Sequence, residues 1–269
     1  MRIIAVSDIH LGYKQSNQKD FLRFLQWLEK DEKKIDHLVL LGDIFDFWRR
    51  TNANVVLQEE CVPEIIEILS GLRKKMNIHY VIGNHDYLIL KFAEKFGTDY
   101  PFTVKKYLRL QDREQGFYFT HGYDLDVTRN MEPFSVEEYE AFAEKMCYSP
   151  DPLGSVASFF WGIIEWIGIH LLFRRVNLKS FNERGDDFET LMDLAASPGV
   201  DIFLGKHPGD FLIFGHTHIA GFYTDKNQNK VTVINTGAWI DDPPTKDGIP
   251  QKNPYALIEN GKMTLEYFT

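Results

Sequence analysis

The chain has 269 residues, of which 44% are hydrophobic, so it can bury a full core as one large domain or as a domain with an insertion. Its formal net charge of −9 argues against a surface built mainly to hold the phosphates of nucleic acid. Two cysteines, Cys61 and Cys147, are too few for a disulfide framework. The apolar stretch in the opening MRIIAVSDIH is too short and too soon interrupted by polar residues for a secretory signal. We therefore expect a cytoplasmic protein.

Short apolar runs predict buried β-strands, and each run ends directly before polar residues. Helical patterns at 21–28 and 55–72 separate the first three runs, which predicts βαβ units and an α/β fold. After residue 216 the pattern changes to short strands joined by turn signals, DKNQNK at 225–230 and ENGK at 259–262, which predicts hairpins. The apolar runs cover residues 3–6, 38–41, 80–82, 117–119 and 211–214.

A long segment, residues 124–209, separates the last two of these strands and is mostly helical in pattern. The stretch VEEYEAFAEKMC from Val136 and the stretch 188–196 both have the amphipathic pattern of surface helices. We therefore expect a catalytic domain made of residues 1–123 and 210–269, with residues 124–209 inserted as a helical cap.

Residues 156–173, inside that segment, are unusually apolar. Their length approaches the lower limit for a membrane span, but Glu165 interrupts them, so we favour a buried or interfacial cap helix. The basic residues Arg174, Arg175 and Lys179 follow. Apolar surface beside basic surface fits an amphiphilic anion or a membrane interface, and the alternative is a helix that only closes the cap's own core.

Ten side chains that can bind metals or transfer protons follow the predicted strands, and they include five of the nine histidines. Ligand sites of open α/β sheets lie beyond the carboxyl ends of strands, so these separate segments can converge on one point. In an extended segment the two histidines of GHTH share a face. The ten residues are Asp8 and His10 in SDIH, Asp43 and Asp46 in GDIFD, Asn84, His85 and Asp86 in GNHD, His121 in THG, and His216 and His218 in GHTH.

The kinds of ligand in this set indicate which metals it would bind. Carboxylates, an amide oxygen and imidazoles together suit Mn, Fe or Zn better than Mg or Ca, which prefer all-oxygen shells. The candidate ligands are too many for one ion, whereas two ions that share a bridging carboxylate would use them all. We therefore expect two divalent ions, with Mn favoured and Fe or Zn as alternatives.

In this order and at these spacings, D-x-H, G-D-x-x-D, G-N-H-D, an isolated histidine and G-H-x-H resemble the signature of the calcineurin-like metallophosphoesterases. The resemblance covers the chain from Asp8 to His218. It implies a sandwich of two mixed sheets flanked by helices and a hydrolase of phosphodiester or pyrophosphate bonds. It also implies the ligands: Asp8, His10, Asp43 and His218 for one ion, and Asp43, Asn84, His121 and His216 for the other.

Two cations about 3.5–4 Å apart can activate a bridging water and stabilise charge on both the attacking and the leaving oxygen, so the reaction needs no serine or cysteine nucleophile. By the same resemblance, His85 would lie beside the phosphate, unbound to metal, and stabilise the transition state or protonate the leaving oxygen. Asp86 would fix its tautomer by a hydrogen bond. Asp46 would support the ligands, and Arg174, Arg175 and Lys179 would contact the substrate.

Within the family, GDIFDFW, GNHDYL, HGYDLD and the insertion between His121 and His216 resemble the UDP-2,3-diacylglucosamine hydrolases and their relatives. Those enzymes cleave a pyrophosphate in a nucleotide-linked lipid and hold its acyl chains in a helical insertion. The resemblance therefore implies a lipid-linked substrate and peripheral membrane contact through the cap. Two departures, His85 where the subfamily has arginine and H-G-Y-D where it has H-G-D, put the substrate in doubt but not the reaction type.

Other members of the family, and a protein that kept only its fold, are the alternatives. Protein serine/threonine phosphatases carry motifs similar to G-D-x-V-D-R-G and G-N-H-E at the corresponding positions. In this sequence Phe47 follows Asp46 and Asp86 follows His85, which argues against a protein phosphatase. The acidic balance argues against a nuclease. Generic and cyclic-nucleotide phosphodiesterases share all five motifs and remain an open alternative. A non-catalytic scaffold would be expected to have lost ligand positions, and all are present here. The oligomeric state stays open.

Overall fold

The computed structural model of the chain describes residues 1–31, 33–48, 56, 58–96, 102–131, 135–148, 185–226, 230–241, 245–246 and 249–269. The predicted apolar helix at 156–173, with Arg174, Arg175 and Lys179, lies outside the described residues. Among the helices that are described, none combines the length and the apolar character that crossing a membrane requires.

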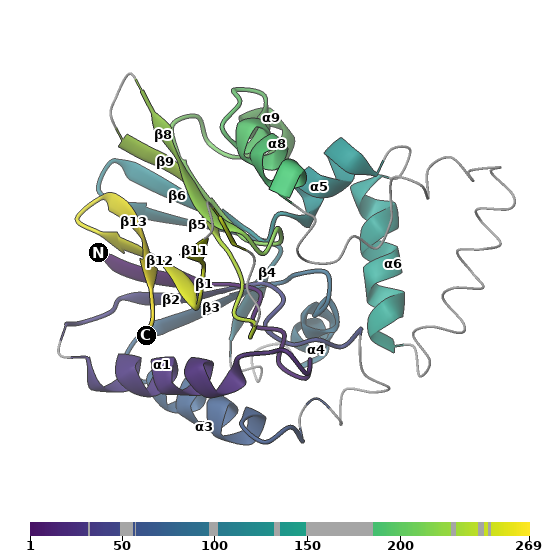
Figure 1. Cartoon of the computed structure of the whole chain (residues 1–269), viewed down its shortest axis with the longest axis vertical. Helices are drawn as coiled ribbons and strands as arrows, with labels where there is room; N and C mark the ends of the chain where they lie inside the picture. Colours follow the sequence, from purple (N-terminus) through teal and green to yellow (C-terminus); the bar gives the residue numbers. More distant parts are fainter. Residues whose placement is uncertain are drawn as a thin grey trace, which may run out of the picture.

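Two mixed β-sheets form the centre of the molecule (Figure 1). The larger has six strands in the order β13-β12-β1-β2-β3-β4; its strands β1 to β4 run parallel, and β12 and β13 form an antiparallel hairpin at one edge. The strand bounds are β1 (Arg2–Val6), β2 (His37–Leu41), β3 (Asn77–Val81), β4 (Thr103–Lys105), β12 (Pro254–Glu259) and β13 (Lys262–Tyr267).

The second sheet has five strands in the order β5-β6-β7-β9-β8, with β6, β7 and β9 parallel and an antiparallel strand at each edge. The α/β sandwich of two mixed sheets is therefore confirmed. The strands are β5 (Tyr107–Asp112), β6 (Gln115–Thr120), β7 (Phe211–Phe214), β8 (Ala220–Asp225) and β9 (Lys230–Thr236), and a small separate ladder pairs β10 (Thr245–Lys246) with β11 (Ile249–Pro250).

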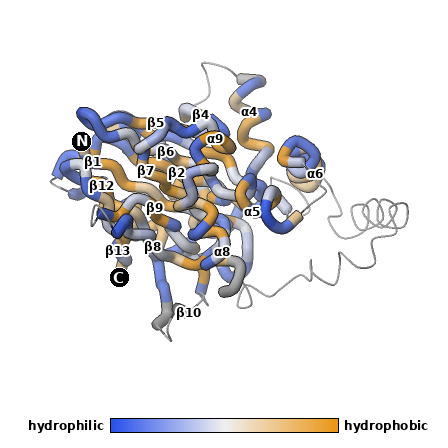
Figure 2. The backbone as a smooth tube through the Cα atoms, turned by 90° about the horizontal axis from the view of Figure 1, so that it is seen from above, coloured by the Kyte–Doolittle hydropathy of each residue, from blue (hydrophilic) through white to orange (hydrophobic). Residues whose placement is uncertain are grey.

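The hydrophobic interior is divided by the alternation of side chains along each strand. On β1, Ile3 and Ala5 pack between the two sheets, whereas Ile4 and Val6 pack towards the helices, because successive side chains point to opposite faces. Phe117 and Ile213 meet the first pair from the second sheet. Figure 2 shows the result: hydrophobic strands lie inside, and hydrophilic turns surround them.

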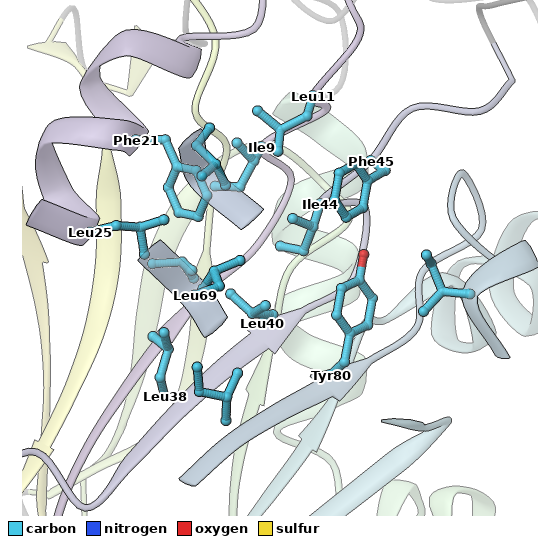
Figure 3. Close-up of a cluster of buried hydrophobic side chains, with 14 of the residues drawn as sticks. Ile9, Leu11, Phe21, Leu25, Leu38, Leu40, Ile44, Phe45, Leu69 and Tyr80 are labelled. Atoms are coloured by element: carbon cyan, nitrogen blue, oxygen red, sulfur yellow. The ribbon is translucent and has the colours of Figure 1, made fainter. Parts of the chain in front are cut away.

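Helices α1 (Gln18–Lys30) and α3 (Val62–Leu72) cover the outer face of the six-stranded sheet. In Figure 3, Phe21 and Leu25 of α1 and Leu69 of α3 lie over Leu38 and Leu40 of β2. The first predicted helix is confirmed. The second predicted helix, at 55–72, is interrupted by turns at 58–61, and α3 begins at Val62, where a proline in the first turn suits a helix start.

Helices also form every described element between β6 and β7, namely α5 (Tyr123–Asn130), α6 (Val136–Tyr148), α8 (Gly185–Ala195) and α9 (Val200–Leu204). Helix α8 packs on the outer face of the five-stranded sheet through Phe188, Leu191 and Met192, so it forms the fourth layer of the sandwich. Helix α6 lies beyond the strand ends, next to α5 and to α4 (Leu88–Phe96) (Figure 1). The division of the chain at residues 124 and 209 stays a prediction.

Both predicted hairpins are present at the end of the chain. The turn between β12 and β13 places Asn260 and Gly261 at φ 55° and 73°. A positive φ at both central residues is typical of the type I′ turn, whose twist matches that of the two strands. The other hairpin joins β8 to β9.

Candidate metal centre

The predicted site residues follow the carboxyl ends of five strands, three in one sheet and two in the other. Parallel strands end at the same edge of a sheet, so residues far apart in the chain meet there. Asp8, His10 and His218 bring ligand atoms within 4.8 Å of one another, and Asp43, His121 and His216 do the same. The structure thus brings together six of the seven predicted ligands in two adjoining groups.

The first group is almost completely buried. His218 Nε2 lies 3.2 Å from Asp8 Oδ1 and 3.1 Å from His10 Nε2. Asp8 and His10 are fully buried, and His218 is 4% exposed. Two imidazole nitrogens and a carboxylate oxygen therefore face the same small volume.

The second group is centred on Asp43. His121 Nδ1 lies 3.0 Å from the carbonyl oxygen of Leu41, which can only accept, so Nδ1 carries the proton and Nε2 is left for the site. That Nε2 lies 3.2 Å from Asp43 Oδ2. The same carboxylate oxygen lies 4.0 Å from His10 Nε2 in the first group, so Asp43 stands between the two groups.

The backbone at five of these residues has an uncommon conformation. Asp8, His10, Asp43, His216 and His218 have φ between 52° and 69°, in the left-handed region. Few residues other than glycine adopt it, and asparagine, aspartate and histidine do so most readily. Such conformations cost free energy and persist where the surrounding structure holds them.

Hydrogen bonds between the loops hold this backbone in place. The amide of His216 donates to Asp8 Oδ2 at 3.0 Å, and the amide of His85 donates to Asp43 Oδ1 at 2.8 Å. The loops also pass very close together, since a Cβ at Gly83 would lie 2.1 Å from Asp43 Oδ1. The glycine of the G-N-H-D motif is therefore required by the close approach of Asp43, in the loop that follows the adjacent strand β2.

Opposite charges balance the burial of these groups. Burial raises the pKa of Asp8, but His121 and His218 outweigh it and hold that pKa at about 2. Burial also opposes ionisation of Asp43, whose pKa His121 and His85 nevertheless keep well below its usual range. Burial lowers the pKa of His121, and Asp43 and Asp8 outweigh it and raise that pKa to about 10. The buried carboxylates are thus ionised and attract cations.

Asn84, the seventh predicted ligand, supplies a test of whether the site suits metal ions. Its side chain is 3% exposed, and among the described residues its Oδ1 has no hydrogen-bond partner. A buried amide oxygen without a partner costs free energy, and coordination of a cation would satisfy it. Together with two carboxylates and four imidazoles, it forms a donor set that fits Mn, Fe or Zn.

His85 lies at the edge of the site, where its side chain is 12% exposed. The structure corrects the expectation that Asp86 orients it. Asp86 instead accepts hydrogen bonds from Tyr80 Oη and from the amides of Ile44 and Gly83, and so braces two loops. Figure 3 shows Tyr80 pointing from β3 towards the loop that carries Ile44. The partner of His85 is Asp46, whose Oδ1 lies 3.1 Å from His85 Nδ1.

Two further contacts were not expected from the sequence. The ring of Trp48 stacks on His85 with centroids 4.2 Å apart, and Asp126 Oδ2 lies 2.9 Å from His216 Nε2. The aromatic end of GDIFDFW, and the acidic residue five positions after His121, are the sequence signals that point to these residues. Neither signal states which histidine the residue reaches.

Known proteins are similar to this chain over most of its length. A family model for calcineurin-like phosphoesterases matches residues 1–220. The UDP-2,3-diacylglucosamine hydrolase of Photorhabdus laumondii is 26% identical over 220 residues, which cover 81% of this chain and 82% of that protein. The protein of that name from Vibrio cholerae is 22% identical over 245 residues, covering 89% and 91%.

Among solved structures, a dimetal phosphatase from Danio rerio aligns over 100% of this chain and 99% of its own, with 15% identity and a TM-score of 0.46. The family model spans four fifths of the chain and includes all five motifs. The chain therefore belongs to the calcineurin-like phosphoesterase family, and it is a hydrolase of phosphoester or pyrophosphate bonds.

Proposed function

We propose that this protein hydrolyses its substrate at a centre of two divalent metal ions, with Mn as the native metal and Fe or Zn as alternatives. The observation that carries the proposal is the position of Asp43 Oδ2, 3.2 Å from His121 Nε2 and 4.0 Å from His10 Nε2, where one carboxylate serves both groups. The proposed ligands are Asp8, His10, Asp43 and His218 for one ion, and Asp43, Asn84, His121 and His216 for the other.

The ions, when bound, lower the pKa of a water towards neutrality and stabilise the charge that develops on the attacking and leaving oxygens. The residues of the chain supply the remaining functions. His85 is the proposed proton donor to the leaving oxygen, and it lies where substrate can reach it. Asp46 accepts a hydrogen bond from His85 Nδ1, so His85 in its protonated, imidazolium form would carry the proton to be transferred on Nε2 and return to the neutral ring after giving it up, and the stacked ring of Trp48 fixes the plane of the imidazole.

The proposed substrate is a phosphorylated small molecule, and in its finer form a nucleotide-linked lipid such as UDP-diacylglucosamine, cleaved at its pyrophosphate. Two observations support the finer form. Both relatives described above carry the name of that hydrolase, and the sequence at 156–179 combines an apolar run with the basic residues Arg174, Arg175 and Lys179. A cytoplasmic location with peripheral membrane contact through the segment 124–209 belongs to the same proposal.

The test is hydrolysis by metal-stripped protein, with and without added Mn, of four substrates: a nucleotide-linked lipid pyrophosphate, a simple phosphodiester, a phosphomonoester and single-stranded DNA. We expect Mn-dependent turnover with a strong preference for the lipid pyrophosphate. A preference for the simple diester or for DNA would retain the two-ion reaction and reject the lipid substrate. Less than one Mn bound per chain, with no turnover of any substrate, would reject the two-ion proposal itself.

A further inference from the structure

The contact between Asp126 and His216 joins helix α5 to the second group of candidate ligands. Asp126 Oδ2 lies 2.9 Å from His216 Nε2, and Asp126 Oδ1 accepts a hydrogen bond of 2.7 Å from Asn130 one turn further along α5. The side chains of Asp126 and His216 are 19% and 8% exposed. The carboxylate is thus held on both oxygens in a largely buried place.

The local fold explains why the helix approaches so closely. Gly122 has a φ of 108°, which turns the chain directly from β6 and His121 into α5. A Cβ at this position would lie 2.8 Å from Phe214 Cδ2, on the strand that precedes His216. Glycine therefore permits both the turn and the close packing against the end of β7, and Asp126 reaches His216 one helical turn later.

The chemistry of the pair fixes which ring nitrogen carries a proton. An ionised carboxylate can only accept hydrogen bonds, so His216 Nε2 must donate to it. In the neutral imidazole the lone pair then lies on Nδ1, and only a nitrogen with a lone pair binds a metal. The ring of His216 also makes a T-shaped contact with the ring of His121, with centroids 5.3 Å apart. This neighbour restricts the orientation of the His216 ring.

We propose that Asp126 is a positioning residue for the metal centre: it fixes the tautomer and orientation of His216 so that Nδ1 binds the second ion. The inference rests on the proposed two-ion function. It assigns a role to the segment inserted after His121, because the first helix of that segment holds a ligand from the loop that follows β7. Carboxylates that hold a metal-binding histidine in this way typically contribute about 10–100-fold in metal affinity.

The test is calorimetric titration of the metal-stripped full chain with Mn²⁺ for wild type, Asp126→Ala and Asp126→Asn. The reference for loss of the same ion is His216→Ala, and the matched control is Asp193→Asn, an exposed acidic residue on α8. We expect two ions per wild-type chain. Asp126→Ala should weaken the binding of one ion by about 10–100-fold and leave the affinity for the other unchanged. Asp126→Asn should lose less affinity, because its amide oxygen still accepts a hydrogen bond from His216 Nε2.

Thermal unfolding of the ion-free variants separates positioning from general stability, since the proposed role predicts an unfolding temperature close to that of wild type. Unchanged affinity for both ions in Asp126→Ala would overturn the inference and leave the proposed function standing. If both Asp126 variants lost one ion completely, as expected for His216→Ala, Asp126 would itself be a ligand, and the inference that it only positions His216 would be wrong. Fewer than two ions in wild type would overturn the proposed function and this inference together.

Discussion

Asp46 Oδ1 lies 3.1 Å from His85 Nδ1, so a buried carboxylate holds the imidazole at the edge of the site. Asp46 Oδ2 also lies 3.3 Å from His10 Nδ1. One carboxylate thus hydrogen-bonds the proposed proton donor and lies beside a candidate ligand. Burial lowers the pKa of His85, and Asp46 and Asp43 oppose that shift.

Replacement of Asp46 by alanine is expected to lower kcat by about 10–100-fold, because His85 and His10 lose the group that orients them. Replacement of His85 by alanine removes the proton donor itself and is expected to lower kcat by about 10²–10⁴-fold without loss of bound Mn. The double variant decides how Asp46 acts. If it acts through His85, the double variant loses little more than His85→Ala alone, whereas a role through His10 only would make the two losses multiply.

Asp43→Ala is expected to remove both ions and nearly all activity, because its carboxylate lies between the two groups of ligands. The measurement is Mn content after dialysis, together with turnover of the preferred substrate. Asp193→Asn, with the same loss of charge on an exposed helix face, should keep both. A variant at Asp43 that still bound two ions would show that the carboxylate does not bridge them.

Gly83→Ala is expected to destabilise the fold by about 1–3 kcal/mol, the usual range for overpacking a buried site. The added Cβ would lie 2.1 Å from Asp43 Oδ1 and 2.5 Å from the Asp43 backbone nitrogen, and backbone cannot move aside cheaply. Gly199→Ala is the matched control, since a Cβ there meets nothing within 4 Å and φ is −69°. Urea unfolding should show a lower free energy of unfolding for Gly83→Ala than for Gly199→Ala. Equal values would mean that the loops at Gly83 and Asp43 move apart to accommodate the added methyl group.

Stability is expected to fall with acidification between pH 6.5 and 4 because of a histidine pair at the other end of the strands. His37 Nδ1 lies 2.9 Å from His79 Nε2, and burial, followed by the neighbouring His37, lowers the pKa of His79 to about 4. In this range the unfolded chain binds the proton and the folded chain does not, so the free energy of unfolding rises with pH. The stability is complete above pH 6.5 and is lost as the pH falls towards 4.

Urea unfolding at pH 7 and pH 4.5 checks this prediction. His79→Gln should lose about 1–2 kcal/mol less than wild type between the two values, an amount limited by the partial exposure of the ring. His207→Gln, at an exposed histidine, should lose as much as wild type. If His79→Gln lost as much unfolding free energy as wild type between the two pH values, the pair would not titrate in this range.

The parts of the fold that local sequence determines could be predicted. Strands such as β7, both hairpins and helix α1 follow from hydrophobic periodicity and turn residues within a few positions. The candidate ligands could be found for a similar reason, because His216, Asp43 and the others follow strands whose ends must meet at one edge.

Contacts between loops could not be predicted in the same way. Asp46 and Asp86 stand in equivalent places after two strands, and only the packing of the loops decides that Asp46 reaches His85 while Asp86 reaches Tyr80. The pairing of Asp126 with His216 depends on how closely α5 approaches β7, which periodicity does not state. The packing of α8 on the second sheet is likewise set by tertiary contacts, so the amphipathic pattern at 188–196 predicts a helix but not its partner.

The left-handed backbone at Asp8, His10, Asp43, His216 and His218 limits which amino acids can serve at this centre. Glutamate and cysteine also bind these metals, yet neither shares the readiness of aspartate and histidine to adopt positive φ. A change from aspartate to glutamate would therefore be unfavourable twice, once in the reach of the side chain and once in the main chain. The backbone conformation of the loops therefore restricts the ligands at these five positions to aspartate and histidine before any metal ion binds.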